Sequence, residues 1–217
     1  METLKKFISD ELHSDPDFYL SNFEKYQDLI LDWNKKINLI SRKSESIEDH
    51  IVNSIFFLTK FKINNGQKIA DIGTGGGFPG IPLKILYPEI ELTLIDSIQK
   101  KVTVLEDVIM KMNFKDTKAV WARAEELSMN KIYRNKYDIV ISKAVATLDK
   151  LYLWGKNFLK KDGKMICIKG GEINSEIETL NKLNEKINIE EILFSFGQGY
   201  NIEDKKIVVI QKKQTVK

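Results

Sequence analysis

Cysteine and histidine are scarce in this sequence, which limits the kinds of site it can build. Cys167 is the one cysteine among 217 residues, so a disulfide framework and a zinc site with several thiolates are excluded. With 2 histidines, a histidine-rich metal centre is not expected either. We therefore expect no metal, and a lone cysteine suits a reducing compartment such as the cytoplasm.

Long apolar runs are lacking as well. No segment approaches the roughly 18 consecutive apolar residues of a membrane span, and the first residues lack the apolar stretch of a signal peptide. Proline is rare, at 4 residues, and 42% apolar with 30% charged residues is a globular composition. At this length we expect a soluble, cytoplasmic monomer without membrane association, with one main domain and a smaller appendage.

A strong excess of one charge is also missing. The 34 Lys and Arg residues against 31 Asp and Glu residues leave a net charge of +3, too little to indicate a nucleic-acid partner. Basic doublets could together form a surface that faces phosphate, or could be ordinary solvated lysines. They are Lys35-Lys36, Arg42-Lys43, Lys100-Lys101, Lys160-Lys161 and Lys212-Lys213.

A helical region is predicted over residues 1 to 60. A short first helix should end near His13, and Ser14-Asp15-Pro16 predicts the start of a second helix. An apolar stripe marks one face of this second helix. The stripe consists of Phe23, Tyr26, Ile30, Trp33, Ile37 and Ile40. A third helix is predicted over about residues 46 to 60. Its inward face comprises Ile47, Ile51, Ile55 and Leu58, and its polar face comprises His50, Asn53 and Ser54.

From about residue 67, apolar strands alternate with amphipathic helices. The predicted strands cover residues 68–72, 91–95, 118–121, 137–141 and 164–168, and helices cover residues 98–112 and 172–186. This alternation predicts a Rossmann-like, doubly wound, mostly parallel sheet that binds its ligand at the carboxyl ends of the strands. Two last strands, at residues 190–196 and 205–211, are joined by a short connection that contains the stretch at residues 197–201. They should form a hairpin, which makes the seventh strand antiparallel.

A glycine-rich stretch follows the first of these strands. Glycines let a ligand approach bare backbone, because a Cβ would block it. Two fingerprints fit the stretch: Gly75-x-Gly77-x-x-Gly80 is typical of NAD enzymes, and Asp71-x-Gly73-x-Gly75-x-Gly77 is typical of S-adenosylmethionine (SAM) methyltransferases. A nucleotide-binding loop is therefore predicted, with two cofactors in competition.

Other features favour SAM. Asp71 precedes the first glycine, the antiparallel last strand is typical of SAM-dependent methyltransferases, and the turn Arg123-Ala124-Glu125-Glu126 follows the third strand, where an adenine would lie. Asp96 ends the second strand and is expected at the ribose, although an acid there serves both cofactor classes.

The acceptor of the methyl group is harder to predict. The turn after the fourth strand, Ser142-Lys143-Ala144-Val145-Ala146, lacks the Asn/Asp-Pro-Pro-aromatic loop that grips an exocyclic amino group, and it lacks a nucleophilic cysteine. Such a site suits an acceptor that is already nucleophilic, such as guanine N7, whose lone pair needs no general base. Catalysis would then depend on positioning and electrostatics.

Several basic residues are candidates for contact with a substrate. Lys143 and Lys169 lie at the predicted carboxyl ends of strands, where each could bind nucleic-acid phosphate or the cofactor carboxylate, or could be an ordinary strand-end lysine. His50 is either a substrate contact or a satisfied helix histidine. Arg123 could pair with Glu126 or reach phosphate.

The sequence as a whole resembles the RsmG (GidB) methyltransferases, which modify guanine N7 in a conserved loop of bacterial 16S ribosomal RNA. The most specific motif is the phrase from Gly73 to Pro82, because generic SAM loops rarely continue as Phe-Pro-Gly-Ile-Pro. Other matching segments are Trp33-Asn34-Lys35, Asn38-Leu39, residues 50–54, Leu94-Ile95-Asp96-Ser97, Lys100-Lys101, Arg123-Ala124-Glu125-Glu126, residues 142–146 and Lys169-Gly170.

This resemblance implies a methyltransferase domain over residues 61–217, a helical region over residues 1–60, SAM as cofactor, and 16S ribosomal RNA or the small subunit as partner. The implied cofactor residues are Asp71, Gly73, Gly75, Gly77, Phe78, Asp96, Ala124, Glu125 and Lys143. The candidate RNA contacts are Asn38, His50, Arg123, Lys143 and Lys169. Two positions depart from the family pattern: Lys143 replaces the usual arginine and loses its bidentate fork, and Asn53 replaces the usual aspartate.

Overall fold

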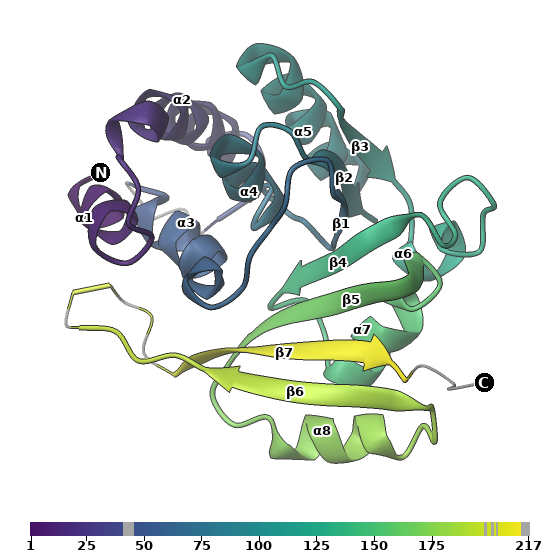
Figure 1. Cartoon of the computed structure of the whole chain (residues 1–217). Coiled ribbons are helices and arrows are strands. Elements are labelled where there is room, and N and C mark those ends of the chain that lie inside the picture. The colour runs from purple at the N-terminus through teal and green to yellow at the C-terminus, as the bar shows by residue number, and fades with distance from the viewer. Residues whose placement is uncertain (41–45, 198, 201, 203, 214–217) are drawn as a thin grey trace.

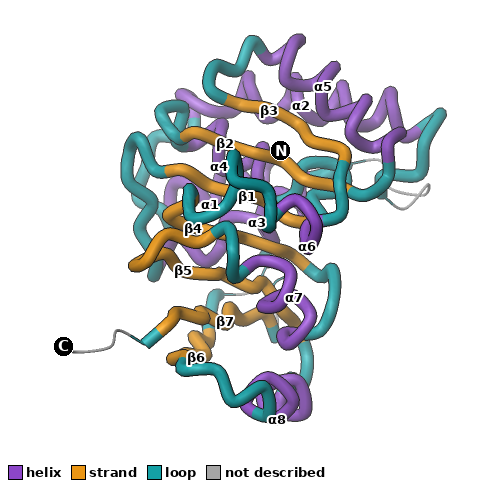
Figure 2. The backbone as a smooth tube through the Cα atoms, turned by 90° about the vertical axis from the view of Figure 1, so that its right-hand side faces the viewer, coloured by secondary structure: helices purple, strands orange, loops and turns teal. Residues whose placement is uncertain are grey.

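A seven-stranded sheet with strand order β3-β2-β1-β4-β5-β7-β6 forms the centre of the protein. This computed structural model describes residues 1–40, 46–197, 199–200, 202 and 204–213. The strands are β1 (Lys68–Ile72), β2 (Glu91–Asp96), β3 (Thr117–Trp121), β4 (Tyr137–Lys143), β5 (Leu159–Gly170), β6 (Ile187–Leu193) and β7 (Lys205–Lys212). Figure 2 shows them side by side in this order, with β3 at one edge and β6 at the other.

The direction of the strands confirms the predicted fold class. β1, β2, β3, β4 and β5 pair in parallel, whereas β7 runs antiparallel to both β5 and β6. Successive strands are added on one side of β1 up to β3 and on the other side from β4 onward, so the strand order changes direction between β1 and β4. Such a switch point opens a crevice at the carboxyl ends of the strands. The glycine-rich loop follows β1 at this place.

Helices cover both faces of the sheet. They are α1 (Glu2–Asp10), α2 (Asp17–Asn34), α3 (Glu48–Ile55), the 3-10 helix η1 (Phe56–Thr59), α4 (Gly80–Leu86), α5 (Gln99–Met112), α6 (Ala124–Leu127), α7 (Leu148–Gly155) and α8 (Asn174–Asn181). Side chains along a strand point alternately to the two faces of the sheet. In β1, Ile69 therefore packs on one face with α4, α5 and the N-terminal helices, whereas Ala70 and Ile72 pack on the other face with α7 and α8.

The N-terminal helices share this core with the sheet. Leu4 of α1, Tyr26 of α2 and Ile51 of α3 are fully buried in the same cluster as Ile69 of β1. Figure 1 shows α1, α2 and α3 gathered beside α4, on the side of the sheet away from α8. The predicted inward face of the third helix is buried throughout.

Several boundaries differ from the predictions. The apolar stripe continues to Ile40, but α2 ends at Asn34, because the Asn34 side-chain oxygen accepts hydrogen bonds from the backbone N–H groups of Leu39 (2.8 Å) and Ile40 (3.1 Å). Ile40 is buried nonetheless. α1 ends at Asp10, before the positive φ of His13.

The predicted third helix is shorter than expected, since its last turn is η1. The prediction that Ser54 belongs to the polar face of this helix is wrong. Ser54 is buried, and its hydroxyl donates a hydrogen bond to the His50 carbonyl (2.6 Å). A hydroxyl can be buried on the apolar side of a helix when it bonds to the carbonyl of the preceding turn.

The C-terminal boundaries also shift. α8 ends at Asn181, and β6 begins at Ile187 and ends at Leu193, so the connection to β7 is longer than the predicted turn. Residues 198 and 201 of that turn lie outside the described residues. β5 starts at Leu159, earlier than predicted, because its first residues extend beside Tyr137 of β4.

The basic doublets do not form a single surface. Lys100 and Lys101 lie in the first turn of α5, after the carboxyl end of β2. The doublets at residues 160–161 and 212–213 lie at the opposite edge of the sheet, where β5 begins and the antiparallel β7 ends. The doublet at residues 42–43 falls outside the described residues.

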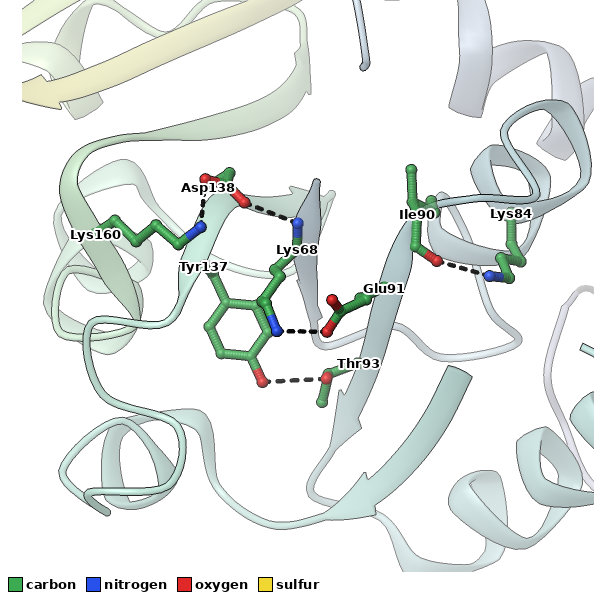
Figure 3. Close-up of polar contacts among 8 residues, drawn as sticks. All are labelled: Lys68, Lys84, Ile90, Glu91, Thr93, Tyr137, Asp138 and Lys160. Carbon is green, nitrogen blue, oxygen red and sulfur yellow. Dashed lines mark hydrogen bonds and ion pairs between the residues drawn. The ribbon is translucent and has the colours of Figure 1, made fainter. Parts of the chain in front are cut away.

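Some lysines of that amino edge are already paired. Figure 3 shows Lys160 bonded to Asp138 (2.7 Å) and Lys68 bonded to Glu91 (2.6 Å). Their charges are therefore partly neutralised within the protein.

No helix in the described part of the chain is long and apolar enough to cross a membrane.

Candidate active site at the carboxyl edge of the sheet

The carboxylate of Asp71 organises the glycine-rich loop from inside. Its Oδ2 accepts hydrogen bonds from the Thr74 hydroxyl (2.7 Å) and from the backbone N–H of Gly80 (2.9 Å), so it ties the start of the loop to the start of α4. Its Oδ1 is buried and has no hydrogen-bond partner among the described residues. Burial raises the pKa of Asp71 to about 7, although both hydrogen bonds and the charge of Lys143 oppose this rise.

The loop glycines serve different purposes. Gly73 has φ +69° and lies against Val145, so that an added Cβ would come within 2.7 Å of both Val145 methyl carbons. Gly75 has φ +59°, but a Cβ there would meet no atom of the described residues within 4 Å. Gly73 is thus required by packing, and the space beside Gly75 is open to a ligand.

Helix α2 reaches the same loop from the N-terminal region. The buried Tyr26 hydroxyl donates to the carbonyl of Gly76 (2.7 Å), and a Cβ on Gly77 would lie 3.0 Å from the Tyr26 oxygen. The N-terminal helices therefore help to hold the loop in place.

Asp96 faces the loop from the end of β2. Its carboxylate accepts the backbone N–H of Gly75 (2.9 Å) through Oδ2 and that of Ile98 (2.9 Å) through Oδ1. An acid at this position in parallel nucleotide-binding sheets bonds to ribose hydroxyls. Asp96 is therefore placed where the prediction puts the ribose.

A pocket opens between the ends of β1, β2 and β3 and the segment after β4. Its walls include four predicted cofactor residues: Gly73, Asp96, Ala124 and Glu125. The other lining residues are Ile72, Ile95, Ser97, Ala122, Arg123, Val145 and Trp154. Apolar side chains with a few polar groups are typical of a small-molecule site.

A second group of predicted residues meets at the Phe78 ring. The His50 ring lies 5.3 Å away between centroids, at 36°, and the Lys143 ammonium lies 5.0 Å from the Phe78 centroid. Burial lowers the pKa of Lys143 to about 8, although the charge of Asp71 raises it. Burial and the charge of Lys143 lower the pKa of His50, which favours its neutral form. An aromatic ring, a neutral imidazole and a cation thus lie together beside the glycine loop.

The remaining candidates are placed differently. Arg123 is exposed at the pocket rim and forms no ion pair in the described parts of the chain. Of its two alternatives, the pairing with Glu126 is therefore not formed, and the contact with phosphate stays a prediction. Asn38 is exposed on the segment after α2. The Lys169 side chain is only 10% exposed and pairs with Glu176 at 2.7 Å, so it does not project freely into the crevice.

Sequence reasoning missed some residues of the site. Tyr26 was predicted only as part of an apolar stripe, although a buried tyrosine hydroxyl needs a hydrogen-bond partner, and this was an available signal. Val145 and Trp154 line the pocket because of how the segment after β4 folds back over β1. No local pattern in the sequence indicates that contact.

Comparison with known proteins identifies relatives over most of the chain. The family model described as "rRNA small subunit methyltransferase G" matches residues 19–205. A relative of that name from Thermoanaerobacter sp. (strain X514) is 39% identical over 179 residues, covering 81% of this chain and 75% of its own. One from Mesoplasma florum is 45% identical over 168 residues, covering 76% of this chain and 70% of its own. One from Clostridium botulinum is 36% identical over 201 residues, covering 91% and 84%.

Solved structures of lower sequence similarity share the fold. A ribosomal protein L11 methylase from Lactobacillus delbrueckii subsp. bulgaricus superposes with a TM-score of 0.56 at 17% identity, over 75% of this chain and 77% of that one. A precorrin-6y C5,15-methyltransferase from Geobacter metallireducens gives 0.54 at 13% identity, over 83% and 96%. The predicted methyltransferase fold is thereby confirmed. The extent and the level of these sequence matches show that the chain belongs to the rRNA small subunit methyltransferase G family, whose cofactor is SAM.

Proposed function

We propose that this protein transfers the methyl group of SAM to N7 of a guanine in the 16S ribosomal RNA of the small subunit. The family supports the RNA substrate. The observation that carries the proposal is that the same glycine loop borders both the pocket and the group of His50 and Lys143 around Phe78. Among the described residues, neither place contains a cysteine that could act as a nucleophile.

The residues of the pocket fit the proposed cofactor. Asp96 would bind the ribose hydroxyls, and Ala124 with Glu125 would border the adenine. The open space at Gly75 allows the ligand to lie against bare backbone, as expected for a loop that includes Gly73 and Gly77. When bound, SAM supplies a methyl group on a positively charged sulfur.

The target guanine would lie near Phe78. N7 of guanine carries a lone pair and no proton, so its methylation requires alignment of reacting atoms rather than a general base. The half-buried ring of the neutral His50 offers a flat surface on which a base can stack, and the buried Phe78 ring supports it from inside.

Lys143 supplies the cation of this site. Its ammonium lies within reach of the glycine loop and of Phe78, so it can hold either the phosphate of the target nucleotide or the carboxylate of the cofactor. Asn38, Arg123 and the helical region over residues 1–60 would receive the adjoining RNA, with Tyr26 linking that region to the site. A substrate of this kind places the protein in the cytoplasm, and we propose that it acts there as a monomer.

Methyl transfer to unmodified ribosomal particles tests the proposal. Small subunits lacking this methyl group are incubated with the protein and isotopically labelled SAM, and the labelled nucleotide is mapped by mass spectrometry. The expected result is 7-methylguanosine at one position. Ribonuclease treatment before the reaction should abolish incorporation, and Asp96→Ala should greatly reduce it.

The rival functions predict other outcomes. Incorporation that survives ribonuclease would indicate a protein or a small molecule as acceptor. Binding of NADH without binding of SAM, measured by calorimetry, would indicate a dinucleotide-binding regulator. Failure to label any ribosomal RNA would refute the proposal.

A further inference from the structure

Lys169 is held inside the protein by two polar groups. Its ammonium donates to the carbonyl of Ala146 (2.9 Å) and pairs with Oε2 of Glu176 in α8 (2.7 Å). The same Glu176 oxygen accepts the backbone N–H of Leu148, the first residue of α7 (3.0 Å). The two side chains are only 10% and 20% exposed. Together, the side chains of Lys169 and Glu176 fix the carbonyl of Ala146 and the N–H of Leu148, the backbone groups on either side of residue 147.

The segment held in this way forms part of the pocket wall. Residues 144–147 connect β4 to α7, and Ala144 has a positive φ of 54°, an unfavourable conformation for a residue with a Cβ. Next to it, Val145 lies against Gly73, and both residues line the pocket together with Trp154 of α7. A shift of this segment would therefore change the width of the pocket.

We propose that Lys169 and Glu176 are positioning residues for the cofactor pocket, and that Lys169 does not contact RNA phosphate. The inference rests on the proposed function, in which this pocket holds the adenosine part of SAM. To reach a phosphate, the Lys169 ammonium would have to leave both a carbonyl and a mostly buried carboxylate. Removal of either partner of such a pair leaves the other charge poorly solvated.

Glu176→Gln separates the positioning role from an RNA contact. A positioning role predicts that this variant and Lys169→Gln both bind S-adenosylhomocysteine about tenfold more weakly by calorimetry. Both should raise the KM for SAM similarly and leave the KM for small subunits within about twofold of the wild type. Because the two residues act as a unit, the double variant should be about as impaired as either single variant.

An RNA contact predicts a different pattern. Lys169→Gln alone would then raise the KM for small subunits and reduce its salt dependence. Glu176→Gln would not weaken RNA binding, since it removes a negative charge. That pattern would overturn the inference.

The Lys156–Glu185 ion pair provides a matched control. It joins the other end of α7 to the chain after α8, and neither residue lines the pocket. Glu185→Gln should change the free energy of unfolding by about as much as Glu176→Gln does, but it should leave the affinity for S-adenosylhomocysteine unchanged. If Glu176→Gln resembles Glu185→Gln in both readouts, the inference is wrong, even though the wild type binds the cofactor and methylates RNA. If the wild type does neither, the proposed function fails instead.

Discussion

Gly73 and Gly75 offer a direct test of why the loop needs glycine. Both have a positive φ, +69° and +59°, so alanine at either position would incur the left-handed backbone penalty of about 1–2 kcal/mol. Only at Gly73 does the new Cβ also collide with the Val145 methyl carbons, at 2.7 Å. Overpacking of this kind costs about 1–3 kcal/mol. Gly75→Ala should therefore lower the free energy of unfolding by about 1–2 kcal/mol, and Gly73→Ala by about 2–5 kcal/mol.

Val145→Ala supplies the second half of the experiment. By itself it removes two methyl groups from a partly exposed side chain and should cost about 1 kcal/mol. In the Gly73→Ala background, Val145→Ala removes the collision with the new Cβ, so it should leave the free energy of unfolding unchanged or raise it. The coupling free energy between the two positions should be about 1–3 kcal/mol.

Urea denaturation of the three single variants and the Gly73→Ala/Val145→Ala double variant measures these terms. Equal destabilisation by Gly73→Ala and Gly75→Ala, or simple additivity of Gly73→Ala with Val145→Ala, would refute the packing argument. Cofactor binding should distinguish the two glycine variants in a different way from stability. Gly75→Ala places its methyl group in the open space of the loop, so it should weaken S-adenosylhomocysteine binding more than its small effect on stability would suggest.

Other predictions concern buried polar groups. Tyr26→Phe leaves the Gly76 carbonyl without its donor and should lower the free energy of unfolding by about 1–3 kcal/mol in urea denaturation, with Tyr26→Leu more severe. Lys84 is buried and donates to the backbone carbonyls of Pro88 and Ile90, the second of which is drawn in Figure 3. Lys84→Met should lower the free energy of unfolding by about 2–3 kcal/mol in the same assay, and a neutral effect would contradict this role. The folded pKa of Asp71, about 7, exceeds the ordinary value of 3.8, so the folded state retains this proton more tightly and stability should fall as the pH rises from about 4 to about 7. Asp71→Asn should flatten that part of the pH–stability curve, and an unchanged curve would show that Asp71 is not its source. Burial raises the pKa of the Cys167 thiol to about 12, so Ellman's reagent should react with it only after unfolding.

The sequence by itself determined the fold class and predicted the end of the sheet at which the pocket lies. The strand over residues 68–72 was predicted with its observed ends, because a short apolar run bounded by a charged residue and glycines has few alternatives. A short connection predicted an antiparallel final strand, and β7 has that direction although the connection is longer than predicted. The residues from Gly73 to Pro82 indicated the family, since their order is far more specific than glycine spacing alone.

Only the tertiary structure decided which polar side chains are free to meet a ligand. Lys143 and Lys169 end neighbouring strands and look equivalent in sequence, yet one lies beside Phe78 and the other is held by Glu176. The basic doublets separate to opposite edges because strand direction, which is not a local property, decides where each one lies. Propensity and periodicity act over a few residues, whereas the partner of a buried charge comes from a distant part of the chain. For that reason the sequence located the pocket, and the packing of the segment after β4 against Gly73 determined its walls.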